Sequence, residues 1–336
     1  MKERPSWFWA ALALALVLLF NLVATPGFFG VTVSEGRLYG SLIDILNRIA
    51  PVALLSLGMT LVIATRGVDL SVGAVMAISG SVAASLIARP EGNLLRFLDI
   101  GGSVPAIVGV ALAVGLVCGL FNGWLVSVTK IQPIVATLLL MVAGRGVAQL
   151  LTDGQIITFH HAGFAALGSG ATAGLPNPFW LVVLAAIAVF GLTRGTALGT
   201  FIEAVGSNPV AARNVGLRTG AVILTVYAVS GVCAALAGLI GTADIQAADA
   251  NNAGLYLELD AILAVSVGGT LLSGGRFSLG GSLVGAALMQ ALTTTILTRG
   301  VPPEMTMVIK AVVVLIVCLL QAPAFHEALR RRKVAA

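Results

Sequence analysis

Residues 104–128 read VPAIVGVALAVGLVCGLFNGWLVSV and contain no charged side chain. A helix of this length crosses the hydrocarbon core of a bilayer, which requires about 20 apolar residues. Gly115, Gly119 and Gly123 recur at every fourth position and therefore share one face of that helix. Small residues on one face let a second helix approach closely in a membrane. The stretch predicts a transmembrane helix packed through its glycine face, a face that also suits sliding between helices.

Nine further apolar runs lie along the chain, at 7–24, 49–65, 71–88, 131–151, 179–193, 219–241, 255–272, 278–298 and 306–322. Hydrophobic residues make up 58% of the 336 residues and charged residues only 10%, whereas a soluble domain carries roughly a quarter charged residues. This composition excludes a soluble enzyme, a nucleic-acid-binding domain and a disordered chain. We expect an all-α integral membrane protein of about ten transmembrane helices, because a helix satisfies its own backbone groups in lipid.

Two features bear on the number of spans. The first run follows Lys2 and Arg4, as in a signal peptide, but its length and the later spans favour an uncleaved first helix. The second and third runs are separated only by the short turn 66–70, so residues 49–88 form either two spans or one broken helix. In both cases we expect residues 1–336 to form a single transmembrane domain.

Basic residues set the expected orientation, because cytoplasmic connections are enriched in Lys and Arg. With the N-terminus inside, the outer connections hold only Arg37, Arg48, Arg89, Arg96 and Arg299. The inner connections and termini hold Lys2, Arg4, Arg66, Lys130, Arg194, Arg213, Arg218, Arg276, Arg330, Arg331, Arg332 and Lys333. We therefore predict that both termini are cytoplasmic, with a cytoplasmic loop at 194–219, a basic cytoplasmic tail at 323–336 and periplasmic loops at 152–178 and 242–254.

Polar side chains within the runs are costly in lipid and therefore indicate contacts or function. Asp260 and Lys310 lie at similar depths, which suggests a structural ion pair, with snorkelling of Lys310 to the interface as the alternative. Neutral amides and an aromatic ring on two neighbouring spans suit a hydroxyl-rich ligand, with interhelical hydrogen bonding as their alternative role. These candidate pathway residues are Asn122, Trp124, Gln132 and Gln149.

The chain lacks the usual signatures of a catalytic or metal centre. Cys118, Cys233 and Cys318 lie in apolar runs without CxxC spacing, so we expect them to be packing residues. His160 and His161 are adjacent and do not share a helix face. No GxxxxGK[ST] phosphate loop or HExxH motif occurs, and no catalytic triad or carboxylate pair can be assembled. We expect no catalytic residue, metal or cofactor, which disfavours a membrane enzyme.

The cytoplasmic segment RGTALGTFIEAVGSNPVAARNVGLRT (194–219) carries a compact helix signal. Asn208 suits the N-cap, and Pro209 suits the first helical position. Residues 210–215 would form a short helix that Gly216 ends. Such a helix either enters a groove on another protein or lies at the membrane surface.

This segment resembles the coupling loop of bacterial ABC importer permeases of the ribose and monosaccharide class. Two further stretches resemble that family's most characteristic sequences, namely GMTLVIATRGVDLSVGAVMAISG (58–80) and ELDAILAVSVGGTLLSGGRFSLGGSLVGA (258–286). The similarity covers nearly the whole chain. It is strongest to permeases of galactofuranose importers, through DILNRIAPVALLSLGMTLVIAT (44–65), KIQPIVATLLLMVAGRGVAQL (130–150) and ADANNAGLYLELDAILAV (248–265).

The resemblance implies a transport subunit of the bacterial inner membrane with no catalysis of its own. Its implied partners are a cytoplasmic ABC ATPase, a second permease subunit (distinct or identical), a periplasmic sugar-binding protein and membrane lipid, but no nucleic acid. The fold implied is an ABC importer permease with a short cytoplasmic coupling helix. The residues implied to dock in the ATPase are Glu203, Ala204, Gly206, Asn208, Ala211, Ala212 and Gly216.

An ion-coupled secondary transporter is the alternative function. Such proteins often carry membrane carboxylates and an internal repeat. Here the spans offer only Glu258 and Asp260 near one edge, and the likeness between the turns before residues 71 and 278 is too weak to establish a repeat. The scarcity of buried charge favours a permease that takes its energy from a partner.

Overall fold

The computed structural model describes residues 7–34, 36–88, 95 and 102–321. The predicted basic tail at 323–336, together with Lys2 and Arg4, lies outside the described residues. The helices are α1 (Phe8–Ala24), α2 (Ser41–Arg48), α3 (Ala50–Ala64), α4 (Val72–Ala88), α5 (Val104–Ser127), α6 (Pro133–Leu151), α7 (Ala162–Ser169), α8 (Asn177–Arg194), α9 (Leu198–Ser207), α10 (Pro209–Asn214), α11 (Thr219–Ile245), α12 (Leu257–Val267), α13 (Leu279–Thr298) and α14 (Pro303–Gln321).

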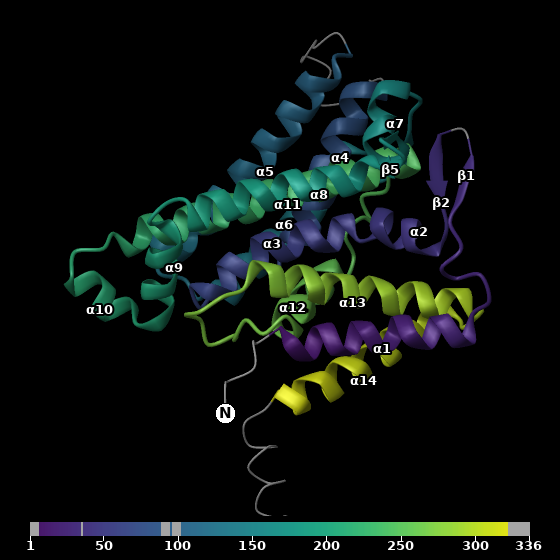
Figure 1. Cartoon of the computed structure of the whole chain (residues 1–336). Coiled ribbons are helices and arrows are strands. Elements are labelled where there is room, and N and C mark those ends of the chain that lie inside the picture. Colours follow the sequence, from purple (N-terminus) through teal and green to yellow (C-terminus); the bar gives the residue numbers. More distant parts are fainter. Residues whose placement is uncertain (1–6, 35, 89–94, 96–101, 322–336) are drawn as a thin grey trace, which may run out of the picture.

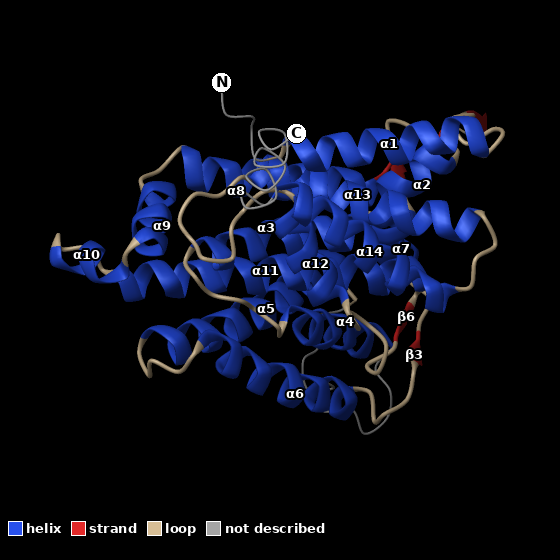
Figure 2. Ribbon diagram, turned by 90° about the horizontal axis from the view of Figure 1, so that it is seen from below, coloured by secondary structure: helices blue, strands red, loops and turns tan. Residues whose placement is uncertain are grey.

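Short antiparallel strand pairs complete the described part of the chain. They are β1 (Thr32–Ser34) with β2 (Arg37–Tyr39), β3 (Ile157–Thr158) with β6 (Ala247–Ala248), and β4 (Ala171–Thr172) with β5 (Leu175–Pro176). Figure 1 shows β1, β2 and β5 at the end of the bundle opposite α10, and Figure 2 shows β3 and β6 on the side opposite α10. The predicted periplasmic loop 152–178 is therefore partly ordered, because it contains α7 and three of these strands.

Helix α11 lies at the centre of the bundle, packed against α3, α4 and α5. Every residue of α3 except Pro51 is buried, and so is α4 up to Leu86. Figure 2 shows α6 along one side of this centre and α1 along the opposite side. Helices buried all round carry no amphipathic stripe, which is why α3 and α4 read as continuous apolar runs in the sequence.

The glycine face of α5 packs against α11, as the four-residue spacing predicts. A Cβ at Gly115 would lie 2.6 Å from the Gly231 carbonyl oxygen, and one at Gly119 would overlap the Tyr227 carbonyl. The same spacing recurs in α13, where Gly285 lies against the Ala264 backbone of α12. Both pairs of helices approach so closely that backbone touches backbone.

The count of about ten spans is not confirmed. Within the described residues, five helices are long and apolar enough to cross a membrane, namely α5, α6, α8, α11 and α13. The bent pair α2 and α3, with an angle of 43° between them, raises the number to six. Helices α1 and α4 and the Met305–Leu319 part of α14 are apolar but shorter. The predicted run 255–272 was wrong as a single long helix, because α12 ends at Val267 and a glycine-rich loop follows.

Residues 49–88 form two separate helices. The chain leaves α3 at Ala64, turns through residues 65–71 and enters α4 at Val72. Arg66 adopts a positive φ of 66° in this turn. The turn 65–71 interrupts the helix here, and the bent pair near this region is α2 with α3.

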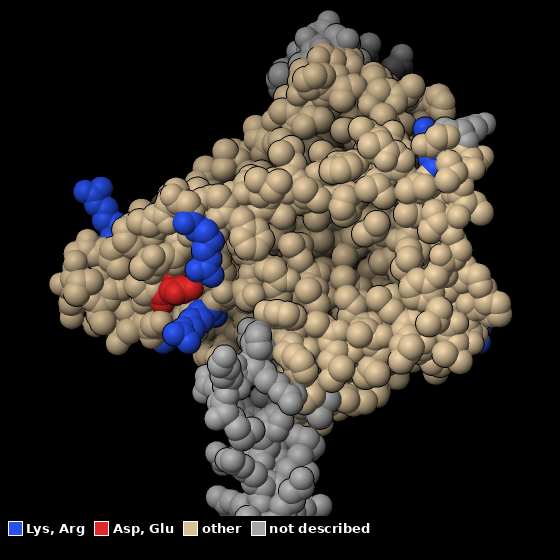
Figure 3. Space-filling model, in the orientation of Figure 1, with Lys and Arg blue, Asp and Glu red and all other residues tan. Residues whose placement is uncertain are grey.

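The two ends of the bundle differ in composition. On the face in Figure 3, most visible charged side chains gather at the end formed by α9 and α10, and the middle of this face carries none. The turn 65–71 contacts this same end through Arg66. The opposite end carries α7 and the strand pairs (Figure 1). This division matches a bundle whose middle lies in lipid.

Candidate coupling segment and the polar contacts behind it

Helix α10 forms as predicted, at the tip of the bundle (Figure 1). The Asn208 side-chain oxygen accepts hydrogen bonds from the backbone N–H groups of Val210 and Ala211, each 3.0 Å long. Pro209 occupies the first helical position. Gly216 follows the helix with φ of +88°, a conformation that glycine adopts without strain. The cap, the proline and the glycine therefore have the local roles that the sequence predicts for them.

The exposed surface of this tip combines apolar and polar side chains. Val210 and Val215 are 67% and 79% exposed, and Ala211, Arg213 and Asn214 are also exposed. Ala212 is buried. A short capped helix with exposed valines beside an arginine has the shape and chemistry to enter a groove of another protein.

Helix α9, which precedes α10, was not predicted from the sequence. It contains three of the candidate residues, Glu203, Ala204 and Gly206. Glu203 and Ala204 are half-buried and Gly206 is buried. A Cβ at Gly206 would overlap the Ala64 carbonyl oxygen, so this glycine allows α9 to contact the end of α3. Gly206 therefore contacts the body of this chain, and the exposed candidates lie around α10.

Arg66 joins the turn 65–71 to α9. Its guanidinium donates hydrogen bonds to the carbonyl oxygens of Gly206 and Ser207, at the C-terminal end of α9. Those carbonyls have no partner within their own helix, and the end of a helix dipole favours a cation. Gly275 donates its backbone N–H to the Ala64 carbonyl at 2.9 Å, which adds the loop after α12 to the same junction.

Asp69 lies at the centre of a buried polar network, and its side chain is 2% exposed. One carboxylate oxygen accepts from the Ser71 hydroxyl at 2.7 Å and from the Ser71 backbone N–H at 3.1 Å, at the start of α4. The other accepts from the Ser230 hydroxyl of α11 at 2.8 Å. The Asn122 amide of α5 donates to the Ser71 hydroxyl at 2.8 Å and to Asp69 at 3.4 Å. The network ties the turn 65–71 to two central helices.

The four candidate pathway residues are not brought together. Asn122 is buried in the Asp69 network, whereas Trp124 is 47% exposed and stacks on Phe121. Gln132 occupies the N-cap position of α6, and its side chain makes no capping hydrogen bond. Gln149 lies seventeen positions further along, about 25 Å away along a helix axis, and donates to the Asn251 side chain at 2.7 Å. The four residues therefore form no single cluster within this chain, and their role in a path stays a prediction.

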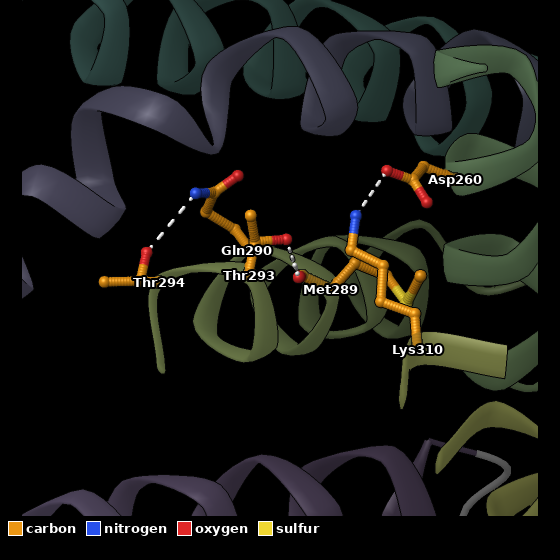
Figure 4. Close-up of polar contacts among 6 residues, drawn as sticks. All are labelled: Asp260, Met289, Gln290, Thr293, Thr294 and Lys310. Carbon is orange, nitrogen blue, oxygen red and sulfur yellow. Dashed lines mark hydrogen bonds and ion pairs between the residues drawn. The ribbon is translucent and has the colours of Figure 1, made fainter. Parts of the chain in front are cut away.

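Asp260 and Lys310 form an ion pair, with 2.7 Å between the Lys310 ammonium and an Asp260 carboxylate oxygen. Figure 4 shows the Lys310 side chain reaching from α14 towards α12, while the Gln290 amide of α13 points away from the pair towards Thr294. The two charged side chains are only 14% and 19% exposed. The pair links α12 to α14.

The segment 242–254, predicted to be periplasmic, is held by side-chain contacts to α6 and within the segment itself. Arg145 of α6 donates to the carbonyl oxygens of Ala250 and Ala253, at 2.9 and 2.6 Å. Asp249 accepts from the Asn252 side chain at 2.7 Å and from the Asn251 backbone at 2.9 Å. The hydrogen bond from the Asn252 side chain is the largest cause that lowers the pKa of Asp249. Among the described residues, no group of three His, Cys, Asp or Glu side chains could hold a metal ion.

Comparison with known proteins places these features in context. The model of the family described as branched-chain amino acid transport system / permease component matches residues 41–318. The chain is 55% identical to the galactofuranose transporter permease protein of Escherichia coli, over 93% of this chain and 89% of that one. It is 40% identical to the fructose import permease protein of Bifidobacterium longum, over 95% of this chain and 88% of that one. It is 35% identical to the ribose import permease protein of Escherichia coli, over 91% of each chain. No solved structure matches it significantly.

Proposed function

The chain belongs to the family of transport permease components described as branched-chain amino acid transport system / permease component, and we propose that it is the transmembrane subunit of an ATP-driven monosaccharide importer. The observation that carries the proposal is the 55% identity to a galactofuranose transporter permease over nearly the whole of both chains. Fructose and ribose import permeases are more distant relatives. We therefore propose galactofuranose as the sugar.

The proposed topology has ten spans in the bacterial inner membrane and both termini in the cytoplasm. The spans are α1, the bent pair α2 and α3, α4, α5, α6, α8, α11, α12, α13 and α14. The short helices α4 and α12 are proposed spans because the central bundle contains both, and neighbouring protein satisfies the irregular backbone at their ends. The division of charge between the two ends supports α9 and α10 at the cytoplasmic end.

The proposed partners follow from the family. A cytoplasmic ABC ATPase hydrolyses ATP, a periplasmic binding protein delivers the sugar, and a second permease subunit, identical or distinct, completes the path. Within this chain, α10 docks in the ATPase through its exposed surface, which carries valines and Arg213. Arg66 then transmits movement of α9 to the turn 65–71, and the Asp69 network carries it to α5 and α11. The relatives' function as import permeases supports this energy source over an ion gradient.

Reconstitution tests the proposal. Liposomes containing this chain, its ATPase, its second permease and its binding protein are given radiolabelled galactose, a fraction of which is furanose. We expect uptake that requires ATP on the side of the liposome membrane where the ATPase lies. Uptake should persist when ionophores collapse the ion gradients. Uptake by this chain alone, driven by a proton or sodium gradient, would contradict the proposal.

A further inference from the structure

A polar cavity lies at the end of the bundle opposite α10. It has a volume of about 280 Å³, close to the lower limit of roughly 300 Å³ for small-molecule pockets. Six elements line it, namely α2, α3, α7, α8, α11 and α13. Its polar lining residues are Asn47, Arg48, Asp244, Gln290 and Thr293.

The lining combines opposite charges with amides that have unused hydrogen-bonding capacity. Arg48 and Asp244 carry opposite charges, are exposed to solvent and line the same cavity. Gln290 is only 9% exposed, and its amide makes one long hydrogen bond of 3.4 Å to Thr294. The Asn47 side-chain oxygen is buried and accepts no hydrogen bond from the described residues. Buried polar groups of this kind normally have partners, so a ligand would complete them.

The cavity reaches into the depth of the proposed membrane. Gln290 lies eight residues before the end of α13 at Thr298, which corresponds to about 12 Å along the helix. Arg48 is the last residue of α2, and Asp244 lies one position before the end of α11. The two charged groups therefore lie at helix ends, and the Gln290 amide lies deeper along its own helix. Charged groups facing lipid are costly, so this lining suits water or a polar solute better than acyl chains.

We propose that this cavity is a monosaccharide subsite of the translocation path, with Arg48, Asp244 and Gln290 as its main hydrogen-bonding groups. The inference rests on the proposed function and names where in this chain the sugar binds. A carboxylate accepts from two hydroxyl groups, a guanidinium donates to ring and hydroxyl oxygens, and an amide does both. Thr293 and Asn47 add one hydroxyl and one free carbonyl oxygen. Such a set suits a neutral polyol.

Transport by substituted chains tests the subsite. In the reconstituted importer, Asp244→Asn and Gln290→Leu should each lower galactose uptake about tenfold or more, as expected when a charge-assisted or buried hydrogen bond to the ligand is lost. Asp153→Asn is the matched control, because Asp153 is an exposed carboxylate at the same end of the bundle, away from the cavity. It should transport at the wild-type rate. Equal uptake by Asp244→Asn, Gln290→Leu and Asp153→Asn overturns the subsite.

A labelling measurement covers the case in which those substitutions disturb folding. Thr293→Cys is made in a chain whose Cys118, Cys233 and Cys318 are replaced by serine. A membrane-impermeant methanethiosulfonate added from the binding-protein side should label this variant, and saturating galactose with the binding protein should slow the labelling several-fold. Absence of labelling, no effect of galactose, or protection by leucine instead of galactose overturns the inference. Failure of the unsubstituted importer to take up any of galactose, fructose and ribose with ATP would instead refute the proposed function itself.

Discussion

Arg66 shows how one side chain can join parts of the chain that are 140 positions apart. Its guanidinium binds carbonyl groups of α9, while its own backbone lies in the turn 65–71 that holds Asp69. Its positive φ of 66° is uncommon for a residue with a side chain. Strained residues of this kind persist where the surrounding structure requires them and cluster at functional sites.

Replacement of Arg66 by glutamine should reduce the sugar transported per ATP hydrolysed. A neutral amide cannot bridge both carbonyls of α9 with the charged fork that guanidinium offers, so movement of α9 would no longer reach the turn. The measurement is the ratio of uptake to phosphate release in the reconstituted importer. Arg276→Gln is the control, because Arg276 is an exposed arginine in the neighbouring loop. An unchanged ratio in Arg66→Gln would remove Arg66 from the coupling route.

Gly216 offers a cleaner residue-level test, because a Cβ at this position would meet nothing within 4 Å. Only its φ of +88° restricts substitution. Valine disfavours this conformation by an amount of order 1–3 kcal/mol, whereas asparagine tolerates positive φ. We expect Gly216→Val to hydrolyse ATP with little transport and Gly216→Asn to stay near wild type. Wild-type transport per ATP in Gly216→Val would count against α10 as the coupling helix.

Between elements, α5 packs closely on α11. A Cβ at Gly119 would overlap the Tyr227 backbone carbonyl, whereas one at Gly109 of the same helix would meet nothing within 4 Å. Gly119→Ala should therefore destabilise the protein by about 1–3 kcal/mol through overpacking, and Gly109→Ala should leave stability unchanged or slightly raised. Thermal unfolding in detergent measures both. Equal melting temperatures would mean that the helices separate easily at this contact.

The ion pair between α12 and α14 makes a second prediction about elements. Asp260→Asn leaves the Lys310 ammonium, only 14% exposed, without its carboxylate. Breaking a buried pair from one side costs up to about 3–5 kcal/mol, while removing both charges costs less. The single variant should therefore melt below the double variant Asp260→Asn/Lys310→Gln. A double variant that melts no higher than the single one would show that the pair is not energetically coupled.

For the molecule as a whole, the arrangement of charged ends predicts its orientation. Arg213 lies on α10 and is exposed, and Asp153 is exposed in the connection between α6 and β3, a strand at the end opposite α10. In a cysteine-free chain, Arg213→Cys should react with an impermeant thiol reagent only in inside-out vesicles, and Asp153→Cys only in spheroplasts. Each variant is the other's control. Labelling of both from the same side would refute the proposed topology.

Local features were predictable because their causes lie within a few residues. The Asn208 cap, the proline after it and the positive φ of Gly216 each follow from neighbours in the sequence. The glycine face of α5 follows from a spacing of four. Helix α9 was not predicted because it lacks a side-chain cap that would mark its start. The run 255–272 was predicted to be too long because Gly268 and Gly269 were counted as part of the apolar helix.

By itself, the sequence determined that the chain is helical, lies in a membrane and carries a capped helix between α8 and α11, since composition and short spacings encode these properties. Tertiary structure alone decided which polar residues meet. Asp69 binds Ser230, 161 positions away, and the cavity joins Arg48 with Asp244 and Gln290. Such contacts depend on how helices pack, and no local pattern records them. The sequence therefore could not show that Asn122 joins the Asp69 network. For the same reason, the residues now proposed to bind the sugar were not among the predicted pathway residues.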